Sequence, residues 1–436
     1  MKKELEALYR SKFITVDDAL NMVHDGDIVY HGFYGNEPRH ILRRFHEVAD
    51  HVNHVDIWCT NPDEEYPFIM NDDLGSTIEI YTVFYGPTLR KKHHTGRIHY
   101  VPHHIHAAIP AIKECGATPN IFFASVTPPD EYGYVYMSGS QQTEAEIFDI
   151  CDLKIFEVNE NLPHVYGTTR IPLSKVDYFI DAPNPISEPP EPHVSPELWT
   201  LAEHVASLID DGDTIQLGFG GLPHAVAEKL MDKHELGVHT EMFSNSLYHL
   251  MDAGVVTNNL KTVNRGKSVC AFCWGSKELN HYIDHNPMIE MRPTSYTNNP
   301  SIIAAHDNMV SINSALEIDL TAQICSESIG HVQFSGTGGA TDYAYGAFHS
   351  KGGKGIIALT STAQTKHGKV SRIVPMLTQG AVVSIQRNIV DYVITEYGIA
   401  HLRHQPFHKR AQELIRIAHP DFRDELKFQM KKLEIY

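Results

Sequence analysis

Hydrophobic residues along the chain recur in two spacings that alternate over its whole length. Short apolar runs bounded by polar residues predict strands, and apolar positions three and four residues apart predict amphipathic helices. The predicted strands are HVDIWC, TIEIYTVFY, NIFFASV, LKIFEVN, VDYFI, KSVCAFCW, HVQFSG, GIIALTS and AVVSI. Because strands and helices alternate, the pattern predicts an α/β protein with mostly parallel sheets.

One unit of this pattern occurs twice. Residues 25–35 read DGDIVYHGFYG and residues 211–221 read DGDTIQLGFGG, and the two copies align without a gap. A predicted helix precedes each copy: a capping-box pattern at Thr15 starts the first, and Ser195 followed by Pro196 starts the second. Another helix, RHILRRF or HAVAEKLM, follows each glycine-containing loop. The repeat predicts two similar α/β domains that arose by duplication.

A proline-rich segment separates the two copies. Residues 182–196 read APNPISEPPEPHVSP, a sequence that neither continues a helix nor forms an inner strand. The segment predicts a semi-rigid linker between an N-terminal domain at residues 1–181 and a C-terminal domain at residues 197–436. The tail, KRAQELIRIAHPDFRDELKFQMKKL, predicts helix with a break at Pro420.

Composition narrows the classes of function. The formal net charge is −18, which disfavours DNA or RNA as a partner because nucleic-acid binders carry basic patches. No apolar run approaches the roughly 20 residues of a membrane-spanning helix, and the N-terminus lacks the apolar region of a signal peptide. The six cysteines are dispersed, as expected for reduced thiols. We therefore expect a cytoplasmic protein without a membrane partner.

Two patterns raise the question of a metal site. Cys270 and Cys273 have CxxC spacing, but no second pair accompanies them, and they lie in an apolar stretch that predicts a buried strand. The chain has 29 histidines, yet neither an HExxH motif nor a Cys₂His₂ spacing occurs. We expect no metal, and we interpret the histidines as surface or interdomain residues.

The second copy of the repeat offers a candidate ligand site. Strand TIQLGF runs into the loop at residues 220–223 and then into a helix, and glycines there let backbone N–H groups approach an anion. A tight strand-to-helix turn is the alternative interpretation. The next predicted strand, LGVHTEMF at residues 236–243, carries Glu241. Because parallel strands place their carboxyl ends at one edge, we expect Gln216, the loop and Glu241 to converge there.

Other candidates are weaker on pattern alone. The first copy has Tyr34 where the second has Gly220, so the second copy is the better candidate for a ligand role. The glycine-rich segment at residues 335–339 either approaches a ligand or forms a tight turn. Lys354 precedes a strand and is a candidate for a phosphate contact, although most lysines, like most lone glutamates such as Glu241, are simply solvated.

Four motifs in order, GFGGLPHAV, LGVHTEMFSN, FSGTGGATDY and VITEYGIAHLR, resemble the acetyl-CoA hydrolase/transferase family of CoA-transferases. The resemblance covers essentially the whole chain, and within the family it is closest to the 4-hydroxybutyrate CoA-transferase branch, with butyryl-CoA:acetate CoA-transferases beside it. It implies two similar domains of the NagB/RpiA/CoA transferase-like α/β type. A local departure is His404-Gln405-Pro406, where relatives often have a glycine and a lysine.

The resemblance also implies roles for individual residues. Glu241 matches the nucleophile, and Gln216 matches an oxyanion-hole side chain. The residues implied or considered as contacts of CoA are Gly218, Phe219, Gly220, Gly221, Leu222, Gly336, Gly338, Gly339 and Lys354. Coenzyme A is then a substrate, no cofactor is tightly bound, and the partners are acyl-CoA and short carboxylic acids.

The implied reaction is covalent transfer with ping-pong kinetics through a glutamyl-CoA thioester. The favoured acyl donor is 4-hydroxybutyryl-CoA, with butyryl-CoA as the alternative, and acetate is the expected acceptor. Hydrolysis of acyl-CoA uses the same motifs with water as the acceptor. A non-enzymatic sugar-phosphate sensor is disfavoured, because such regulators carry a helix-turn-helix that we do not find. We expect a homo-oligomer.

Overall fold

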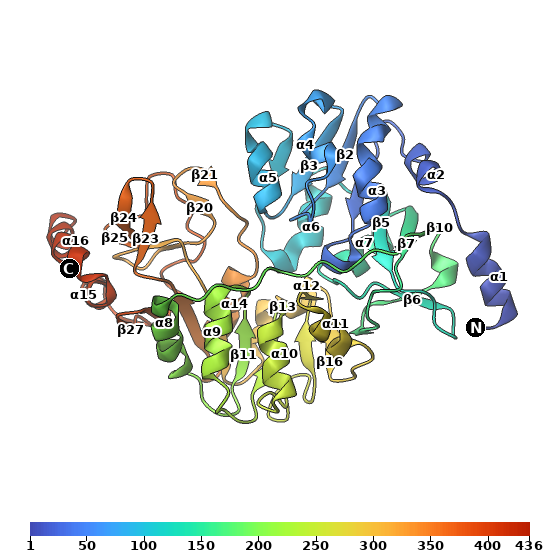
Figure 1. Cartoon of the computed structure of the whole chain (residues 1–436). Helices are drawn as coiled ribbons and strands as arrows, with labels where there is room; N and C mark the ends of the chain where they lie inside the picture. The colour runs from blue at the N-terminus through green and yellow to red at the C-terminus, as the bar shows by residue number, and fades with distance from the viewer. The chain divides into compact units, whose positions relative to one another are not determined.

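The computed structural model describes residues 1–436, and the chain folds into two compact units. The first unit contains Met1–Pro189 and Val269–Tyr296, and the second contains Pro190–Ser268 and Thr297–Tyr436 (Figure 1). The break at Pro189 falls inside the predicted linker. The segment Val269–Tyr296, which the sequence analysis included in the C-terminal domain, differs from that expectation because it belongs to the first unit.

Strand pairing explains why Val269–Tyr296 belongs to the first unit. Residues of β16 (Ile289–Met291) pair in parallel with β8 (Tyr166–Gly167), with Glu290 opposite Tyr166. These two strands form a three-stranded sheet with β14 (Ser268–Cys270). A pairing between segments so far apart in sequence has no local signal, and an assignment based on chain order misses it.

The first unit is built on a seven-stranded sheet in the order β10-β7-β5-β1-β2-β3-β4, with every pair parallel. Its strands are β1 (Ile28–His31), β2 (Val55–Trp58), β3 (Ile78–Thr82), β4 (Ile98–Tyr100), β5 (Ile121–Val126), β7 (Leu153–Val158) and β10 (Tyr178–Asp181). The central strand β5 is buried along its whole length, as expected for a parallel strand covered on both faces. Two apolar clusters form the core, one containing Phe45 and the other Phe122.

Helix α2 begins where the sequence predicts it to begin. Thr15 and Asp18 form a capping box at α2: the Thr15 hydroxyl accepts from the Asp18 N–H at 3.1 Å, and the Asp18 carboxylate accepts from the Thr15 N–H at 2.9 Å. The helices are α1 (Lys3–Ser11), α2 (Val16–Asn21), α3 (Arg39–Arg44), α4 (Pro67–Met70), α5 (Pro87–Lys92), α6 (Ala108–Glu114), α7 (Glu144–Ile150) and α11 (Lys277–Ile283).

The second unit is built on a six-stranded sheet in the order β12-β11-β17-β22-β26-β27. All neighbours are parallel except β26 and β27. The strands are β11 (Thr214–Leu217), β12 (Gly237–Val238), β17 (Met309–Asn313), β22 (Lys354–Ala358), β26 (Tyr392–Thr395) and β27 (Gly398–His401). This mostly parallel order brings the loops after β11, β12 and β17 to one edge of the sheet.

Helices α8, α9 and α10 lie side by side over this sheet (Figure 1). The helices of the second unit are α8 (Pro196–Ala206), α9 (Gly221–Lys229), α10 (Asn245–Asp252), α13 (Pro300–Ala304), α14 (Ala340–His349), α15 (Phe407–Ile417) and α16 (Pro420–Lys432). The predicted break at Pro420 is present, because α16 begins at that residue. The core of this unit gathers Ile318, Ile357, Val393 and Leu414.

Short strands complete both units. They are β6 (Tyr134–Tyr136), β9 (Arg170–Pro172), β13 (Met242–Phe243), β15 (Phe272–Cys273), β18 (Glu317–Asp319), β19 (Ile324–Cys325), β20 (Ser328–Ile329), β21 (Val332–Gln333), β23 (Thr362–Thr365), β24 (Gly368–Ser371) and β25 (Ile373–Val374), and α12 spans Thr294–Thr297. Three strand predictions need correction. AVVSI at residues 381–385 forms no strand beyond an isolated bridge at Ile385. LGVHTEMF is interrupted after Val238, and KSVCAFCW is divided at Ala271 into β14 and β15, which belong to different sheets. Short apolar runs in irregular structure carry the same signal as strands.

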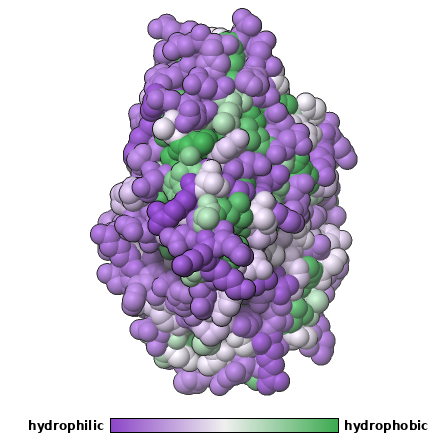
Figure 2. All heavy atoms as spheres, turned by 90° about the vertical axis from the view of Figure 1, so that its right-hand side faces the viewer, coloured by the Kyte–Doolittle hydropathy of each residue, from purple (hydrophilic) through white to green (hydrophobic).

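No helix in this chain combines the length and the apolar character needed to span a membrane. The face shown in Figure 2 is mainly hydrophilic, with hydrophobic atoms gathered mostly in its upper half. All six cysteines are free thiols, and only Cys115 is exposed.

Candidate active site

The second copy of the repeat ends in a turn that requires glycine. The chain leaves β11 at Leu217 and passes through Gly218 to Gly220, whose φ of 112° is in a region that side chains rarely allow. A Cβ on Gly221 would lie 2.3 Å from the carbonyl oxygen of His193, so this position also excludes a side chain. A Cβ on Gly220 would meet nothing within 4 Å, and one on Gly218 would meet only Cγ of Pro223, at 4.0 Å. The turn therefore leaves backbone uncovered at the carboxyl end of β11.

Glu241 lies just beyond the carboxyl end of the neighbouring strand, β12. The strand ends at Val238, and the hydroxyl of Thr240 then donates to the carbonyl oxygen of Leu217 at 3.3 Å. This bond ties the residue before Glu241 to the residue before Gly218. The structure thus brings Glu241 and the start of the glycine loop to the same edge of the sheet.

Two donors hold the Glu241 carboxyl group. Nδ2 of Asn298 donates to Oε2 at 2.7 Å, and the backbone N–H of Gly339 donates to the same carboxyl group. A Cβ on Gly339 would lie 2.2 Å from Oε2 of Glu241 and 2.4 Å from Nδ2 of Asn298. The second glycine-rich loop therefore approaches Glu241 more closely than any side chain would permit.

The surroundings of Glu241 change its acidity. Burial of the carboxyl group raises the pKa of Glu241 to about 7. The hydrogen bond from Asn298 opposes this rise, the buried Asp342 carboxyl adds to it, and the N–H of Gly339 opposes it. The residue as a whole keeps part of its surface exposed. The pKa therefore lies close to neutral pH, where the ionised and the neutral forms are both populated, as is common for groups in functional sites.

Asn298 is itself held in place. The Thr297 hydroxyl donates to Oδ1 of Asn298 at 2.9 Å, so the amide NH₂ faces Glu241. The carbonyl oxygen of Thr297 accepts from the Tyr343 hydroxyl at 2.9 Å and lies 2.8 Å from Nε2 of His239. These contacts fix the donor before any substrate binds.

The sequence analysis did not identify Asn298. The segment TNNP at residues 297–300 has the pattern of a helix N-cap followed by proline, and Asn299 does cap α13 by accepting from the Ser301 N–H at 2.9 Å. The proline at position 300 marks Asn299 as the cap, but nothing in the pattern assigns a contact to Asn298. That contact depends on the tertiary fold.

Gln216 is buried between β11 and β17. Its Oε1 accepts from the Ile312 N–H and from Nδ2 of Asn313, each at 3.2 Å. The remaining hydrogen-bonding capacity of the side chain is the two donors on Nε2. An oxyanion role would use these donors, and the carbonyl contacts fix the plane of the amide.

Lys354 lies at the opposite edge of the sheet. It is the first residue of β22, and its Nζ donates to Asp210 at 2.8 Å and lies 3.4 Å from Asp213. A residue that begins a parallel strand lies at the amino edge, whereas Glu241 lies at the carboxyl edge. The structure does not bring Lys354 to the site, although its place before a strand was visible in the sequence.

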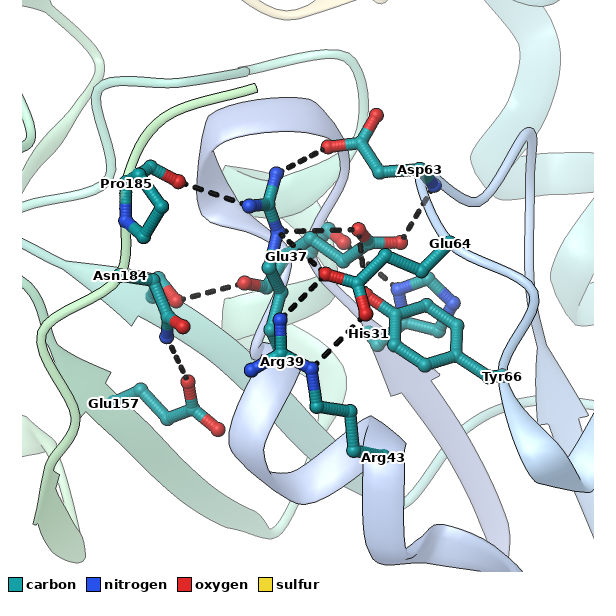
Figure 3. A network of polar contacts seen from close by, with 12 residues as sticks. His31, Glu37, Arg39, Arg43, Asp63, Glu64, Tyr66, Glu157, Asn184 and Pro185 are labelled. Atoms are coloured by element: carbon teal, nitrogen blue, oxygen red, sulfur yellow. Dashed lines mark hydrogen bonds and ion pairs between the residues drawn. The ribbon is translucent and has the colours of Figure 1, made fainter.

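The first copy of the repeat has a different arrangement. Tyr34, at φ 49°, stacks on Phe272 with ring centroids 4.8 Å apart. Beyond this turn Figure 3 shows a polar network in which Arg39 donates to Asp63 at 2.7 Å and lies 3.8 Å from Glu37. Burial raises the pKa of Glu37 well above its usual range. The first copy therefore places a stacked aromatic ring where the second copy has Gly220.

Two groups of metal-ligating side chains lie entirely within the first unit. The ligand atoms of His54, Asp56 and Glu79 lie within 4.8 Å of one another, with Nε2 of His54 paired to Asp56 at 3.1 Å. The sulfur atoms of Cys270 and Cys273 are 3.9 Å apart and buried, and burial raises the pKa of the Cys273 thiol, as in unreactive structural cysteines. Neither group includes a residue of the Glu241 site.

Comparison with known proteins gives matches in both halves of the chain. Residues 1–188 match the acetyl-CoA hydrolase/transferase N-terminal domain, and residues 275–430 match the C-terminal domain of the same family. The 4-hydroxybutyrate coenzyme A transferase of Clostridium kluyveri is 38% identical over 98% of this chain and 99% of its own. RipA from Yersinia pestis is 33% identical, with both chains fully covered and a TM-score of 0.93. The 4-hydroxybutyrate CoA-transferase of Porphyromonas gingivalis is 31% identical over 98% of this chain and 99% of that chain, with a TM-score of 0.80.

These matches define the class of protein: the chain belongs to the acetyl-CoA hydrolase/transferase family. The resemblance seen in the four motifs is confirmed, and so is the α/β fold of CoA-transferase type. Within this family the chain is a CoA-transferase, an enzyme whose substrates are CoA thioesters.

Proposed function

We propose that the enzyme transfers CoA between a short-chain acyl-CoA and a carboxylate such as acetate, with Glu241 as the covalent carrier. One observation carries the proposal: the Glu241 carboxyl group lies at the carboxyl edge of the sheet and accepts hydrogen bonds from Asn298 and from the N–H of Gly339. Position 339 has no room for a side chain. The favoured donor is 4-hydroxybutyryl-CoA, because two of the matched relatives are named 4-hydroxybutyrate CoA-transferases. Butyryl-CoA, which lacks one hydroxyl group, is the alternative.

The proposed reaction conserves the thioester on the enzyme. A Glu241 oxygen attacks the thioester carbonyl carbon, the carbon–sulfur bond breaks, and a mixed anhydride and CoA thiolate result. The thiolate attacks the glutamyl carbonyl carbon and releases the first carboxylate, so Glu241 becomes a CoA thioester. The acceptor carboxylate then attacks the glutamyl carbonyl carbon, which breaks the carbon–sulfur bond and gives a new mixed anhydride and CoA thiolate. The thiolate attacks the acyl carbonyl carbon of this anhydride and releases the new acyl-CoA and the free Glu241 carboxylate.

The surrounding donors fit the charges that this reaction creates. Oxygen atoms become negative at the thioester carbonyl carbon and later at the glutamyl carbonyl carbon, and fixed donors stabilise such charge by about 3–4 kcal/mol each in comparable sites. Asn298 and the Gly339 N–H already face the glutamyl group, and Nε2 of Gln216 is the proposed donor for the substrate oxygen. We propose that the loops at residues 218–222 and 336–339 bind CoA, whose remote contacts lower the barrier for the chemistry.

Hydrolysis is the competing outcome at the same site. If water reaches the glutamyl thioester before a carboxylate does, the product is free CoA and the enzyme acts as a hydrolase. The two outcomes differ in whether CoA release from acyl-CoA requires an added carboxylate. We propose transfer as the main activity and retain the expectation of a cytoplasmic homo-oligomer from the sequence.

Intact mass measurement after incubation with acyl-CoA tests the proposal directly. We expect an increase equal to one CoA less one water, located on the peptide that contains Glu241. Glu241→Gln should give no adduct. Glu228→Gln, which alters an exposed residue of α9, should form the same adduct as the enzyme without a substitution. An adduct on a different residue, or none during turnover, would overturn the covalent role of Glu241.

A further inference from the structure

Glu327 is a buried carboxyl group close in sequence to the second glycine-rich loop. It lies in the second unit between β19 and the β20–β21 hairpin that Figure 1 labels, and only 4% of its surface is exposed. Removing a carboxylate from water is costly unless donors replace the lost hydration. The residues that donate hydrogen bonds to the Glu327 carboxyl group therefore indicate its role.

The side chain of Glu327 binds the glycine-rich loop. Its Oε2 accepts from the hydroxyl of Thr337 at 2.9 Å, which is the threonine of the GTGG sequence. The same oxygen accepts from Nε2 of Gln333 at 3.3 Å, and Oε1 accepts from the Ser384 hydroxyl at 2.9 Å. Both oxygens are thus engaged, one of them by the loop itself.

The backbone of Glu327 holds the beginning of the same segment. Its carbonyl oxygen accepts from the N–H of Phe334 at 2.8 Å and from the N–H of Ser335 at 3.0 Å. One residue therefore anchors the entry to the loop through its main chain and the middle of the loop through its carboxylate. This double attachment restricts where the following glycines lie.

Those glycines determine the contact with Glu241. Two residues after Thr337 the chain reaches Gly339, having passed through Gly338 at φ 54°. The N–H of Gly339 donates to the Glu241 carboxyl group, and its missing side chain leaves the space that Oε2 of Glu241 occupies. A shift of the loop by a fraction of an ångström changes both the donor and that space.

We propose that Glu327 is a positioning residue, which acts through Thr337 to set the Gly339 N–H against Glu241. The inference rests on the proposed function, because the position of the loop limits the rate only if Glu241 reacts. It also assigns Glu327 no contact with substrate. Its loss should weaken catalysis by misplacing a donor rather than by removing a reacting group.

The acid side of the pH–rate profile separates this role from general destabilisation. Because the Gly339 N–H lowers the pKa of Glu241, moving the loop away should raise that pKa and shift the acid limb of kcat/KM to higher pH. In a variant that is only less stable, the molecules that remain folded should show the same acid limb in the pH dependence of kcat/KM. The limb is therefore a readout that a purely structural role does not move.

The test uses the full chain, four single variants and one double variant. Glu327→Ala should lower kcat/KM for acyl-CoA by about 100-fold, the cost of a misplaced catalytic group, and Glu327→Gln should retain more activity because an amide still meets hydroxyl partners. Thr337→Val removes only the loop contact and should lower kcat/KM by about tenfold. Glu317→Gln is the matched control, since Glu317 also binds a threonine hydroxyl, that of Thr378, at 2.8 Å.

The expected result is an upward shift of the acid limb in the Glu327 and Thr337 variants but not in Glu317→Gln. The double variant Glu327→Gln with Thr337→Val should lose less than the product of the single losses, because both changes break one contact. Two results would overturn the positioning role of Glu327: losses in kcat/KM that multiply in the double variant, or an acid limb that does not move. If the CoA adduct still maps to Glu241, the proposed covalent role of Glu241 is unaffected. If Glu327→Ala does not fold, Thr337→Val still decides the question.

Discussion

A methyl group added to Gly339 would lie 2.2 Å from Oε2 of Glu241, a distance at which the two cannot coexist without movement. The glycine and the carboxyl group are therefore fitted to each other from different strand–loop segments of one unit. Substitutions that disturb this fit, or that change the charge of the carboxyl group, should therefore change the activity of the enzyme.

Gly339→Ala should abolish most activity while leaving the protein folded. The added methyl group forces Glu241 and Asn298 out of position, and misplacement of about 1 Å costs roughly 100-fold in rate. Steady-state kinetics with acyl-CoA and acetate measure the loss. Gly355→Ala is the control, because a Cβ there would meet its nearest neighbour at an ordinary 3.7 Å. Equal activity in the two variants would contradict the fit between Gly339 and Glu241.

Activity should fall as the pH is lowered through about 7. The pKa of Glu241 is raised to about 7, and attack on a thioester requires the ionised form, which becomes populated only as the pH rises through that value. At pH 6 about one-tenth of the enzyme has a carboxylate at this position, and at pH 8 about nine-tenths does. The pH dependence of kcat/KM checks this, and an acid limb near pH 4.5 would show that the site does not raise the pKa.

Asn298→Ala should lower kcat/KM by about 100-fold, as when one fixed donor is removed from an oxyanion site. It should also raise the apparent pKa on the acid limb, because the bond from Asn298 favours the ionised form of Glu241. Its neighbour gives a matched control: Asn299→Ala removes the α13 cap and should cost about 1 kcal/mol of stability without moving the limb. Identical pH profiles for the two variants would argue against a donor role for Asn298.

Lys354→Met should reduce stability but not catalysis. The change removes the cation that pairs with Asp210 and the buried Asp213, and we expect a loss of about 2 kcal/mol in the free energy of unfolding. Chemical denaturation measures this loss, with Lys351→Met, which alters an exposed ion pair, as the control. A large rise in KM for acyl-CoA at unchanged stability would instead restore the phosphate-binding role suggested by the sequence.

Local signals in the sequence were sufficient for much of the fold. The Thr15–Asp18 capping box and the proline at position 420 act over one helical turn, so their effect can be inferred from neighbouring residues alone. The alternation of strands and helices predicted the parallel sheets, and hence the edge at which Glu241 lies. That inference needed only the order of the elements along the chain.

The rest of the site depended on distances that local patterns do not contain. Asn298 donates to Glu241 from the short connection between α12 and α13, whose sequence resembles a simple helix cap. Lys354 was a candidate phosphate contact because it comes at the start of a predicted strand, but the first residue of the parallel strand β22 lies at the amino edge of the sheet. LGVHTEMF is interrupted after Val238, where the Thr240 hydroxyl donates to the carbonyl oxygen of Leu217, a residue of another strand.

The segment Val269–Tyr296 belongs to the first unit although it is flanked in sequence by residues of the second. The polypeptide therefore passes from one unit to the other three times, and the proline-rich connection is only the first of these passages. A gene cut at that connection would give a first half that lacks two of the three strands of the β14-β16-β8 sheet. The two halves should accordingly be interdependent in biosynthesis, and neither should mature as an autonomous module.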